Sequence, residues 1–365
     1  MTGDNVTAPT STRARLLKTA RIALTVAALA FVVLALASRW DEVTGQLGRV
    51  SPQAVAGAFG CSLLGLFFSM LAWRALLADL GSPLPLGPGL RVFFLAQVGK
   101  YLPGAVWPFV AQMELGKALG VPRQRSAVGG LLFVGMHCAT GLLVASATLP
   151  FASPAAAERY WWVLAFTPVL LVVLHPRVLS PLLDRAFWLL RRPPLPRALS
   201  LGNTVRACGF LLVTWAFYGL SVLALARPLG LHGASSFFLA TGAYALAWSA
   251  GVMVLGLVPA GIGVREVILG AILLPVLPAG EATAVVATSR VVQTLGDTLW
   301  ALGAGFLLRG SMRRAADRMG DPAPAADPVP ASPVSPASPT SPTSPTSPTS
   351  PVPPPEAGRG GLTAG

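Results

Sequence analysis

The chain has 365 residues, of which 53% are hydrophobic and only 11% are charged, and its mean hydropathy is +0.65. Soluble domains carry roughly 25% charged residues, so this composition excludes that class and indicates a polytopic membrane protein. The net charge of +13 comes mostly from arginines in loops and near both ends, which favours cytoplasmic loops over nucleic-acid binding. We expect an all-α membrane helix bundle of about eight crossings, with no nucleic-acid partner.

Residues 1–19 are predicted to be a disordered, basic cytoplasmic lead, and residues 20–38 a first crossing of the ~30 Å hydrocarbon core. Basic residues before this run resemble a signal peptide, but the run continues to Arg39 and Trp40 without a small-x-small cleavage site. An uncleaved helix is therefore favoured. Residues 54–77 form the second predicted crossing, with Trp73 and Arg74 expected as anchors at the membrane interface.

The next apolar segment, residues 86–110, is interrupted by the sequence QVGKYLPGAVW at residues 97–107. A lysine and a Pro-Gly break are costly at membrane depth, and they are tolerated where the backbone is covered by protein or lines a wet cavity. Basic residues lie on both sides of the break, with Arg91 before it and Lys117 after it. If both flanks are cytoplasmic, the segment must enter the membrane and return.

The remaining crossings are expected at residues 127–149, 160–174, 206–226, 235–257, 262–277 and 284–308. The loop at 175–204 has the densest arginine cluster, so the loop and both termini are predicted to be cytoplasmic, in the plasma membrane. These limits give a transmembrane domain at 20–310, followed by a basic and then Pro/Ser/Thr-rich tail at 311–365. We expect a disordered, solvated tail; recognition by SH3-type domains or phosphorylation at Ser-Pro sites is the alternative.

A second interruption, GLVPAGIGVREVILGA, occupies residues 256–271. Two Gly/Pro-interrupted hydrophobic segments in corresponding positions of two halves indicate a transporter-type substrate site. The fold is therefore expected to contain two broken segments, either re-entrant or discontinuous. We also expect them to meet near the membrane midplane and to share one cavity, since polar backbone exposed at each break costs several kcal/mol in hydrocarbon.

Two blocks, FFLAQVGKYLPGAVWPFVAQMELGKALGVPRQRSA and GLVPAGIGVREVILGAIL, are followed by SRVVQTLGDTLWALGAG. In this order the chain resembles the lysylphosphatidylglycerol synthase transmembrane-region family over about residues 15–310. The family includes the flippase part of multiple peptide resistance factor proteins and stand-alone membrane relatives. Because only the Pro/Ser/Thr-rich tail follows the last helix, the resemblance implies the translocase half and not the aminoacyl transfer to lipid. It does not specify the lipid.

The first break offers candidate head-group contacts. Gln97, Lys100 and Tyr101 share one face of the entering half-helix, and backbone N–H groups freed after Pro103 and Gly104 favour an anion. Lys100 is the predicted phosphate contact. The alternative is a lysine that extends to the interface while the Pro-Gly pair only turns the chain.

The second break and the last helix carry the other candidates. Arg265 and Glu266 point about 100° apart on a helix, so each needs its own partner. A polar stripe on the last helix has the i, i+3, i+4, i+7 spacing of one face. We expect Glu266 to pair with Arg290 and Arg265 with Asp297; a purely structural ion-pair network is the alternative. The remaining candidates are Trp107, Pro259, Gly261, Gly263, Gln293 and, in the stripe alone, Thr294.

Other polar groups are given structural interpretations. His137 is expected to be a satisfied buried imidazole, with a proton relay as the alternative. Cys61, Cys138 and Cys208 are expected to be buried free thiols. The scattered histidines predict no metal site, and no nucleotide-binding or GxSxG motif is present, so neither a cofactor nor direct ATP use is predicted.

Three functions follow from these features. The leading prediction is a translocase for an anionic phospholipid or lipid-linked substrate. The second is a membrane enzyme with Glu266 or Asp297 as a base. The third is a non-catalytic membrane partner of a separate transferase. The sequence gives no oligomeric state.

Overall fold

The computed structural model describes residues 50–102, 106–152, 199–253 and 263–320, with isolated residues between 158 and 185, and it describes side chains as far as residue 306. Within these residues every regular element is a helix, which confirms the predicted all-α bundle. One compact unit ends at Ala316. The elements are α3 (Pro52–Asp79), α4 (Leu86–Gln97), η1 (Val98–Tyr101), α5 (Trp107–Lys117), α6 (Arg123–Thr148), η2 (Leu149–Phe151), α10 (Leu201–Ala226), η4 (Arg227–Leu229), α11 (Ser236–Met253), α12 (Val264–Leu273) and α13 (Ala279–Gly320).

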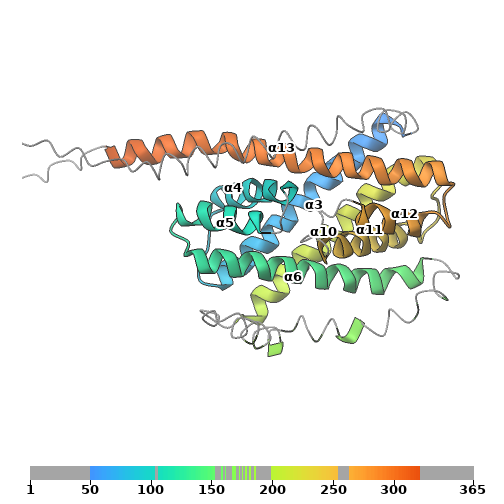
Figure 1. Ribbon diagram of the computed structural model, residues 1–365, viewed down its shortest axis with the longest axis horizontal. Coiled ribbons are helices and arrows are strands. Elements are labelled where there is room, and N and C mark those ends of the chain that lie inside the picture. Colours follow the sequence, from blue (N-terminus) through green and yellow to red (C-terminus); the bar gives the residue numbers. More distant parts are fainter. Residues whose placement is uncertain are drawn as a thin grey trace, which may run out of the picture. The chain divides into compact units, whose positions relative to one another are not determined.

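Helices α3 and α10 pack side by side and antiparallel (Figure 1). Buried Asp79 at the end of α3 accepts hydrogen bonds from the backbone nitrogen and hydroxyl of Ser200 and from the side-chain amide of Asn203, each at 2.8 Å. The Ser200 hydroxyl also caps α10 by accepting from the backbone nitrogen of Asn203. Three donors satisfy this carboxylate, so it fixes the end of α3 to the start of α10.

The first broken segment is a helical hairpin made of α4, η1 and α5. Arg125 of α6 donates to the carbonyl oxygen of Gly81 at 2.9 Å and to the hydroxyl of Ser82 at 3.2 Å, just before α4. At the other flank Arg123 of α6 pairs with Glu114 of α5. Both flanks of the hairpin therefore lie at the same end of the bundle, in the re-entrant form that the basic flanks predicted.

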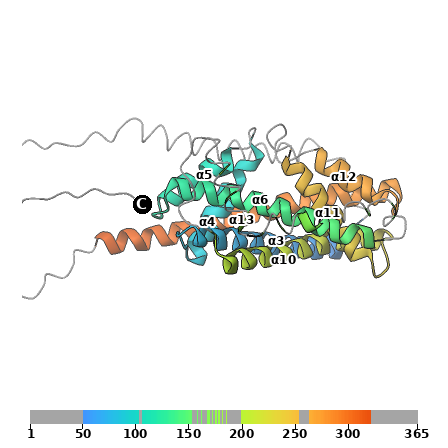
Figure 2. The same ribbon diagram turned by 90° about the horizontal axis from the view of Figure 1, so that it is seen from below.

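A second hairpin, α11 and α12, occupies the other half of the bundle (Figure 2). Its two flanks also lie together, since a Cβ added at Gly230, before α11, would be 3.9 Å from Leu277, after α12. The prediction that residues 262–277 cross the membrane is wrong. Helix α12 has 10 residues and is about 15 Å long, too short for a ~30 Å core. The residues between the two helices, 254–262, lie outside the described residues.

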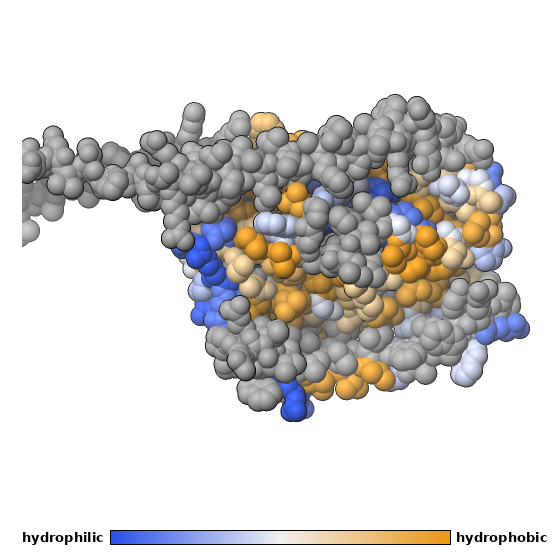
Figure 3. Space-filling model, in the orientation of Figure 1, coloured by the Kyte–Doolittle hydropathy of each residue, from blue (hydrophilic) through white to orange (hydrophobic). Residues whose placement is uncertain are grey.

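Among the described residues, four helices are long and apolar enough to cross a membrane: α3, α6 with η2, α10 with η4, and α11. They match the predicted crossings at 54–77, 127–149, 206–226 and 235–257. Hydrophobic side chains cover the middle of the visible face, and hydrophilic side chains gather toward its two ends (Figure 3). The chain is therefore membrane-embedded. The predicted crossing at 20–38, and most of those at 160–174 and of the loop at 175–204, lie outside the described residues.

The last helix, α13, begins at Ala279 instead of residue 284 and has 42 residues. It is long enough to cross, but it is not among the four helices that are apolar enough over their described residues, and its side chains are described only as far as residue 306. Helix α3 also differs from the prediction, which made Trp73 and Arg74 interfacial anchors. Trp73 is fully buried against Phe93 of α4, with ring centroids 5.6 Å apart, and Arg74 donates to the carbonyl oxygen of Leu84 at 2.5 Å. The prediction of Trp73 as an interfacial anchor is wrong, because α4 covers the end of α3.

Candidate functional site

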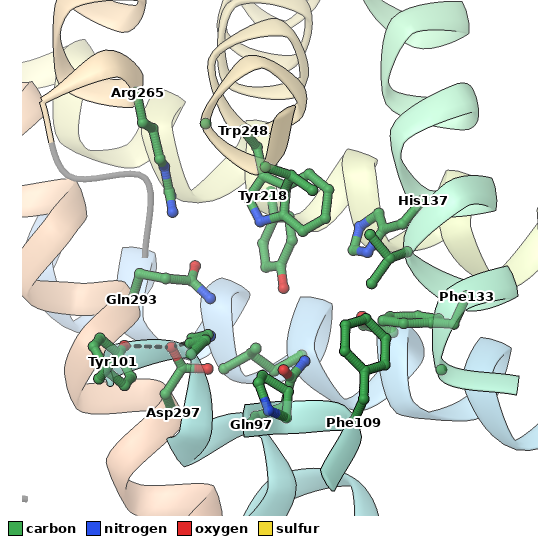
Figure 4. A pocket seen from close by; sticks show the side chains of 18 of the residues that line it. Gln97, Tyr101, Phe109, Phe133, His137, Tyr218, Trp248, Arg265, Gln293 and Asp297 are labelled. Atoms are coloured by element: carbon green, nitrogen blue, oxygen red, sulfur yellow. Dashed lines mark hydrogen bonds and ion pairs between the residues drawn. The ribbon is translucent and has the colours of Figure 1, made fainter. Parts of the chain in front are cut away.

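The two hairpins meet at a cavity of about 100 Å³. Every described α-helix of the bundle contributes to its lining, and the close-up shows side chains from opposite sides pointing into it (Figure 4). A cavity needs roughly 10–15 Å³ by this measure to hold one water. This cavity therefore has room for several waters or a small polar head group, but not for a whole lipid.

At the first hairpin, Lys100 contacts the carboxylate of Asp297 on α13, with Nζ and Oδ2 2.6 Å apart. The hydroxyl of Tyr101 donates to the same oxygen at 2.7 Å. Asp297 is only 5% exposed, and the Lys100 side chain is 23% exposed. This ion pair therefore ties the turn of the first hairpin to the polar face of α13.

At the second hairpin, the guanidinium of Arg265 donates to the hydroxyl of Tyr244 and lies over its ring, 4.4 Å from the centroid. Tyr244 in turn donates to the side-chain oxygen of Gln293 at 2.9 Å, and Ser62 donates to the same oxygen at 3.2 Å. Arg265 is 7% exposed. No carboxylate among the described residues lies within ion-pair distance of it.

One of the two predicted ion pairs is confirmed and the other is wrong. Glu266 pairs with Arg290, with Nε and Oε1 3.4 Å apart, as predicted. The predicted pair between Arg265 and Asp297 is wrong, because Asp297 is engaged by Lys100 and Arg265 stacks on Tyr244. A helical face fixes which residues point inward, but the partner across the cavity depends on how the hairpins pack.

Glu266 also shapes the second hairpin locally. Its other carboxylate oxygen accepts from the backbone nitrogen of Gly263 at 2.6 Å, at the N-terminus of α12. Gly263 has a φ of +92°, a conformation that other residues adopt only with strain. The Gly-Val-Arg-Glu sequence therefore starts a helix at this point and directs Arg265 into the cavity.

A glycine requirement also shapes the first hairpin. A Cβ at Gly99 would lie 2.9 Å from the backbone nitrogen of Pro108 and from the backbone carbon of Trp107. The hairpin can close this tightly only because residue 99 has no side chain. Tight closure brings α5 against η1, where Lys100 and Tyr101 face α13.

The structure gathers most of the predicted site residues. Gly263 caps α12, Glu266 pairs with Arg290 beside the cavity, and Trp107 contributes backbone next to Gly99. Pro103, Gly104, Pro259 and Gly261 lie outside the described residues. The predicted residues that line the cavity are Gln97, Lys100, Tyr101, Arg265, Arg290, Gln293 and Asp297.

The lining residues that the sequence did not place in the site include Gln112 of α5 and His137 of α6. His137 is surrounded by aromatic rings, with centroids of Trp248 at 4.1 Å and Trp215 at 4.7 Å. Neither ring nitrogen of His137 has a hydrogen-bond partner among the described residues. Contrary to the expectation of a satisfied imidazole, the described protein groups do not pair with it. A polar residue in an apolar helix was the only signal, and it gives no information about partners.

The charges of the site do not cancel. Lys100 and Arg290 each have a carboxylate partner, Asp297 and Glu266 respectively, whereas Arg265 has none among the described residues. A buried cation without a counter-ion is costly, and stacking on Tyr244 offsets only part of that cost. The cavity is therefore suited to one negative charge.

Comparison with known protein families gives a match to the family described as lysylphosphatidylglycerol synthase TM region, over residues 20–301. No curated protein matches the chain. The matched range includes both hairpins, α13 through the polar stripe and the whole lining of the cavity. It also agrees with the resemblance carried by the KYLPG and PAGIGVRE blocks. The chain therefore belongs to the lysylphosphatidylglycerol synthase transmembrane-region family.

Proposed function

We propose that this protein is a translocase that moves an anionic phospholipid or lipid-linked substrate between membrane leaflets. The observation that carries the proposal is Arg265, a buried guanidinium without a carboxylate partner among the described residues, in a cavity shared with Lys100. A phosphate supplies the missing negative charge and accepts a bidentate, charge-assisted hydrogen bond from the guanidinium.

The size of the cavity supports a particular form of transport. About 100 Å³ accommodates a head group, so the acyl chains stay in the surrounding hydrocarbon while the polar part passes through protein. Removing charge and hydrogen-bonding groups from water is the main barrier to unassisted movement across a bilayer. In this proposal Lys100, Arg265 and Arg290 replace water around the phosphate.

The two hairpins supply an access route from either leaflet. They lie in opposite halves of the bundle, and α11 and α12 pack on each other as α4 and α5 do. Movement of one hairpin opens the cavity toward one leaflet while the other hairpin keeps it closed. Such gating by discontinuous helices around a fixed central site is a general mode of alternating access.

The proposed orientation places the end at which α3 ends and α6 begins in the cytoplasm of a plasma-membrane protein. Lys117, Arg123, Arg125 and Arg206 gather near this end, and basic loops face the cytoplasm. Single cysteines at Lys117, which is exposed, and at Glu281, which is partly exposed, test the orientation in a background without native cysteines. A membrane-impermeant thiol reagent added to intact cells should label position 281 only, and labelling at 117 would reverse the orientation.

Translocation itself is tested with purified protein in vesicles that contain a trace of anionic phospholipid with a fluorescent acyl chain. A membrane-impermeant quencher added outside measures how fast lipid from the inner leaflet becomes accessible. Arg265→Gln should lower the protein-dependent rate at least ~10-fold, the equivalent of one charge-assisted hydrogen bond. The matched control is Arg206→Gln, an exposed cation beside Phe210 on α10 and outside the cavity lining, which should keep the wild-type rate.

Analysis of the lipid after the vesicle assay separates the competing functions. A rate no higher than in protein-free vesicles would contradict the translocase. In that case, chemical alteration of the lipid, detected by mass spectrometry, would favour the enzyme with Glu266 or Asp297 as a base. Unaltered and unmoved lipid would favour a non-catalytic partner of a separate transferase.

A further inference from the structure

Besides the cations proposed to bind phosphate, the cavity is lined by polar groups without a hydrogen-bond partner among the described residues. These are Oε1 of Gln112, both ring nitrogens of His137 and Oδ1 of Asp297. Their side chains are 4%, 2% and 5% exposed respectively, and all three line the cavity. Figure 4 shows the imidazole of His137 across the cavity from Arg265. Unpartnered buried polar groups are costly, so their concentration in one cavity indicates a ligand that pairs with them.

The hydrogen-bonding capacity of these groups defines the complementary ligand. Gln112 Oε1 and Asp297 Oδ1 only accept, and a neutral imidazole has one accepting and one donating nitrogen. Together these groups present three acceptors and one donor to the cavity. Hydroxyl groups both donate and accept, so they satisfy such a mixture. A quaternary ammonium cannot donate, and a primary ammonium donates but cannot accept from His137.

The charge of the site also favours a ligand with hydroxyl groups over one with an ammonium group. Both carboxylates of the site are paired, Asp297 with Lys100 and Glu266 with Arg290, and the remaining charge is the cation of Arg265. An ammonium in the same cavity would add a like charge where water is scarce. A head group with one phosphate charge and an otherwise uncharged remainder neutralises the site instead.

We infer that Gln112 and His137 form a selectivity region that recognises hydroxyl groups, so that the substrate class is a phosphodiester lipid with an uncharged, hydroxyl-bearing head group such as glycerol, inositol or a sugar. The inference rests on the proposed translocase function and specifies its substrate class. The phosphate lies toward Lys100 and Arg265, and the hydroxyls lie toward Gln112 and His137.

The test uses vesicles of phosphatidylcholine with trace phosphatidylglycerol or phosphatidylethanolamine, each carrying the same fluorescent acyl chain. The wild-type protein should move phosphatidylglycerol about tenfold faster, the equivalent of one hydrogen bond. Gln112→Leu and His137→Phe should each lower that rate to about the rate for phosphatidylethanolamine, which itself stays nearly unchanged. The thermal midpoint of each variant should stay the same or rise, because an unpartnered buried polar group is removed.

Thr288→Val is the matched control. Its hydroxyl is also buried and without a partner among the described residues, but it lies outside the cavity lining. This variant should keep the wild-type preference for phosphatidylglycerol. If Gln112→Leu and His137→Phe instead slow both lipids equally and lower the thermal midpoint, the two residues are structural and the inference is wrong.

Two further outcomes separate the inference from the function on which it rests. Equal wild-type rates for the two lipids, with both slowed by Arg265→Gln, would overturn the inference and leave the translocase standing. Movement of neither lipid would overturn both. If the variants do not fold, the inference is tested on the wild-type protein in detergent. Glycerol phosphate should raise the thermal midpoint of the protein more than phosphoethanolamine does. Equal shifts would contradict the inference.

Discussion

The two hairpins deliver their cations to the same cavity in different electrostatic states. Lys100 of the first hairpin is neutralised by Asp297 across the cavity, whereas Arg265 of the second stacks on Tyr244 and has no carboxylate partner among the described residues. A paired charge contributes to the stability of the fold, and removing it leaves its partner buried and alone. An unpaired charge is a cost to the fold, and an anionic ligand compensates for it. The comparison indicates that the first hairpin holds the bundle together, and in the proposed translocase the second hairpin contacts the substrate more directly.

The largest expected effect on stability follows from this difference. Lys100→Met should lower the free energy of unfolding by about 2–3 kcal/mol, less than the value for a fully buried pair because the lysine is partly exposed. Arg265→Gln should change it by less than about 1 kcal/mol, since no carboxylate is left unpaired. Both variants should lose transport. Thermal unfolding in detergent and the vesicle assay measure the two properties.

A double variant sharpens this prediction. Lys100→Met combined with Asp297→Asn removes both charges and should recover most of the lost stability, because the isolated buried carboxylate is gone. Transport should stay lost, since the lysine is still missing. Recovery of transport together with stability would show that Lys100 has only a structural role.

A smaller effect is expected from the glycines that shape each hairpin. Gly99→Ala should cost about 1–3 kcal/mol, because its Cβ would lie 2.9 Å from backbone atoms that cannot move independently. Gly263→Ala should cost about 1 kcal/mol, because the space is open and only the positive φ opposes a side chain. Gly135→Ala on α6 is the control, with nothing within 4 Å of the new methyl group. Equal thermal midpoints for the three variants would contradict this order.

The smallest effect is expected from a change outside both hairpins. Deleting residues 323–365 should leave insertion, stability and translocation unchanged, because a Pro/Ser/Thr-rich tail has few apolar side chains to bury. The deleted and full-length proteins are compared in vesicles at equal protein density. A lower rate with an unchanged thermal midpoint would show that the tail takes part in transport.

Local chemistry in the sequence was enough to predict the membrane class, the two broken segments and the inward face of the last helix. The cost of a lysine, proline or glycine within an apolar run is local, and so is the helical spacing that aligns Arg290, Gln293 and Asp297. These features predicted seven of the residues that line the cavity and the pair between Glu266 and Arg290. They also predicted the re-entrant form of the first hairpin, because its basic flanks must lie on one side.

Only the tertiary structure decided which groups meet across the cavity. Lys100 and Asp297 are far apart in the chain, and nothing in their local spacing favours this pair over the predicted pair between Arg265 and Asp297. The same holds for Trp73, which α4 covers, and for the unpartnered nitrogens of His137. Helical periodicity fixes the direction of a side chain relative to its own helix. Its partner depends on how that helix packs against elements more than a hundred residues away, which no local pattern encodes.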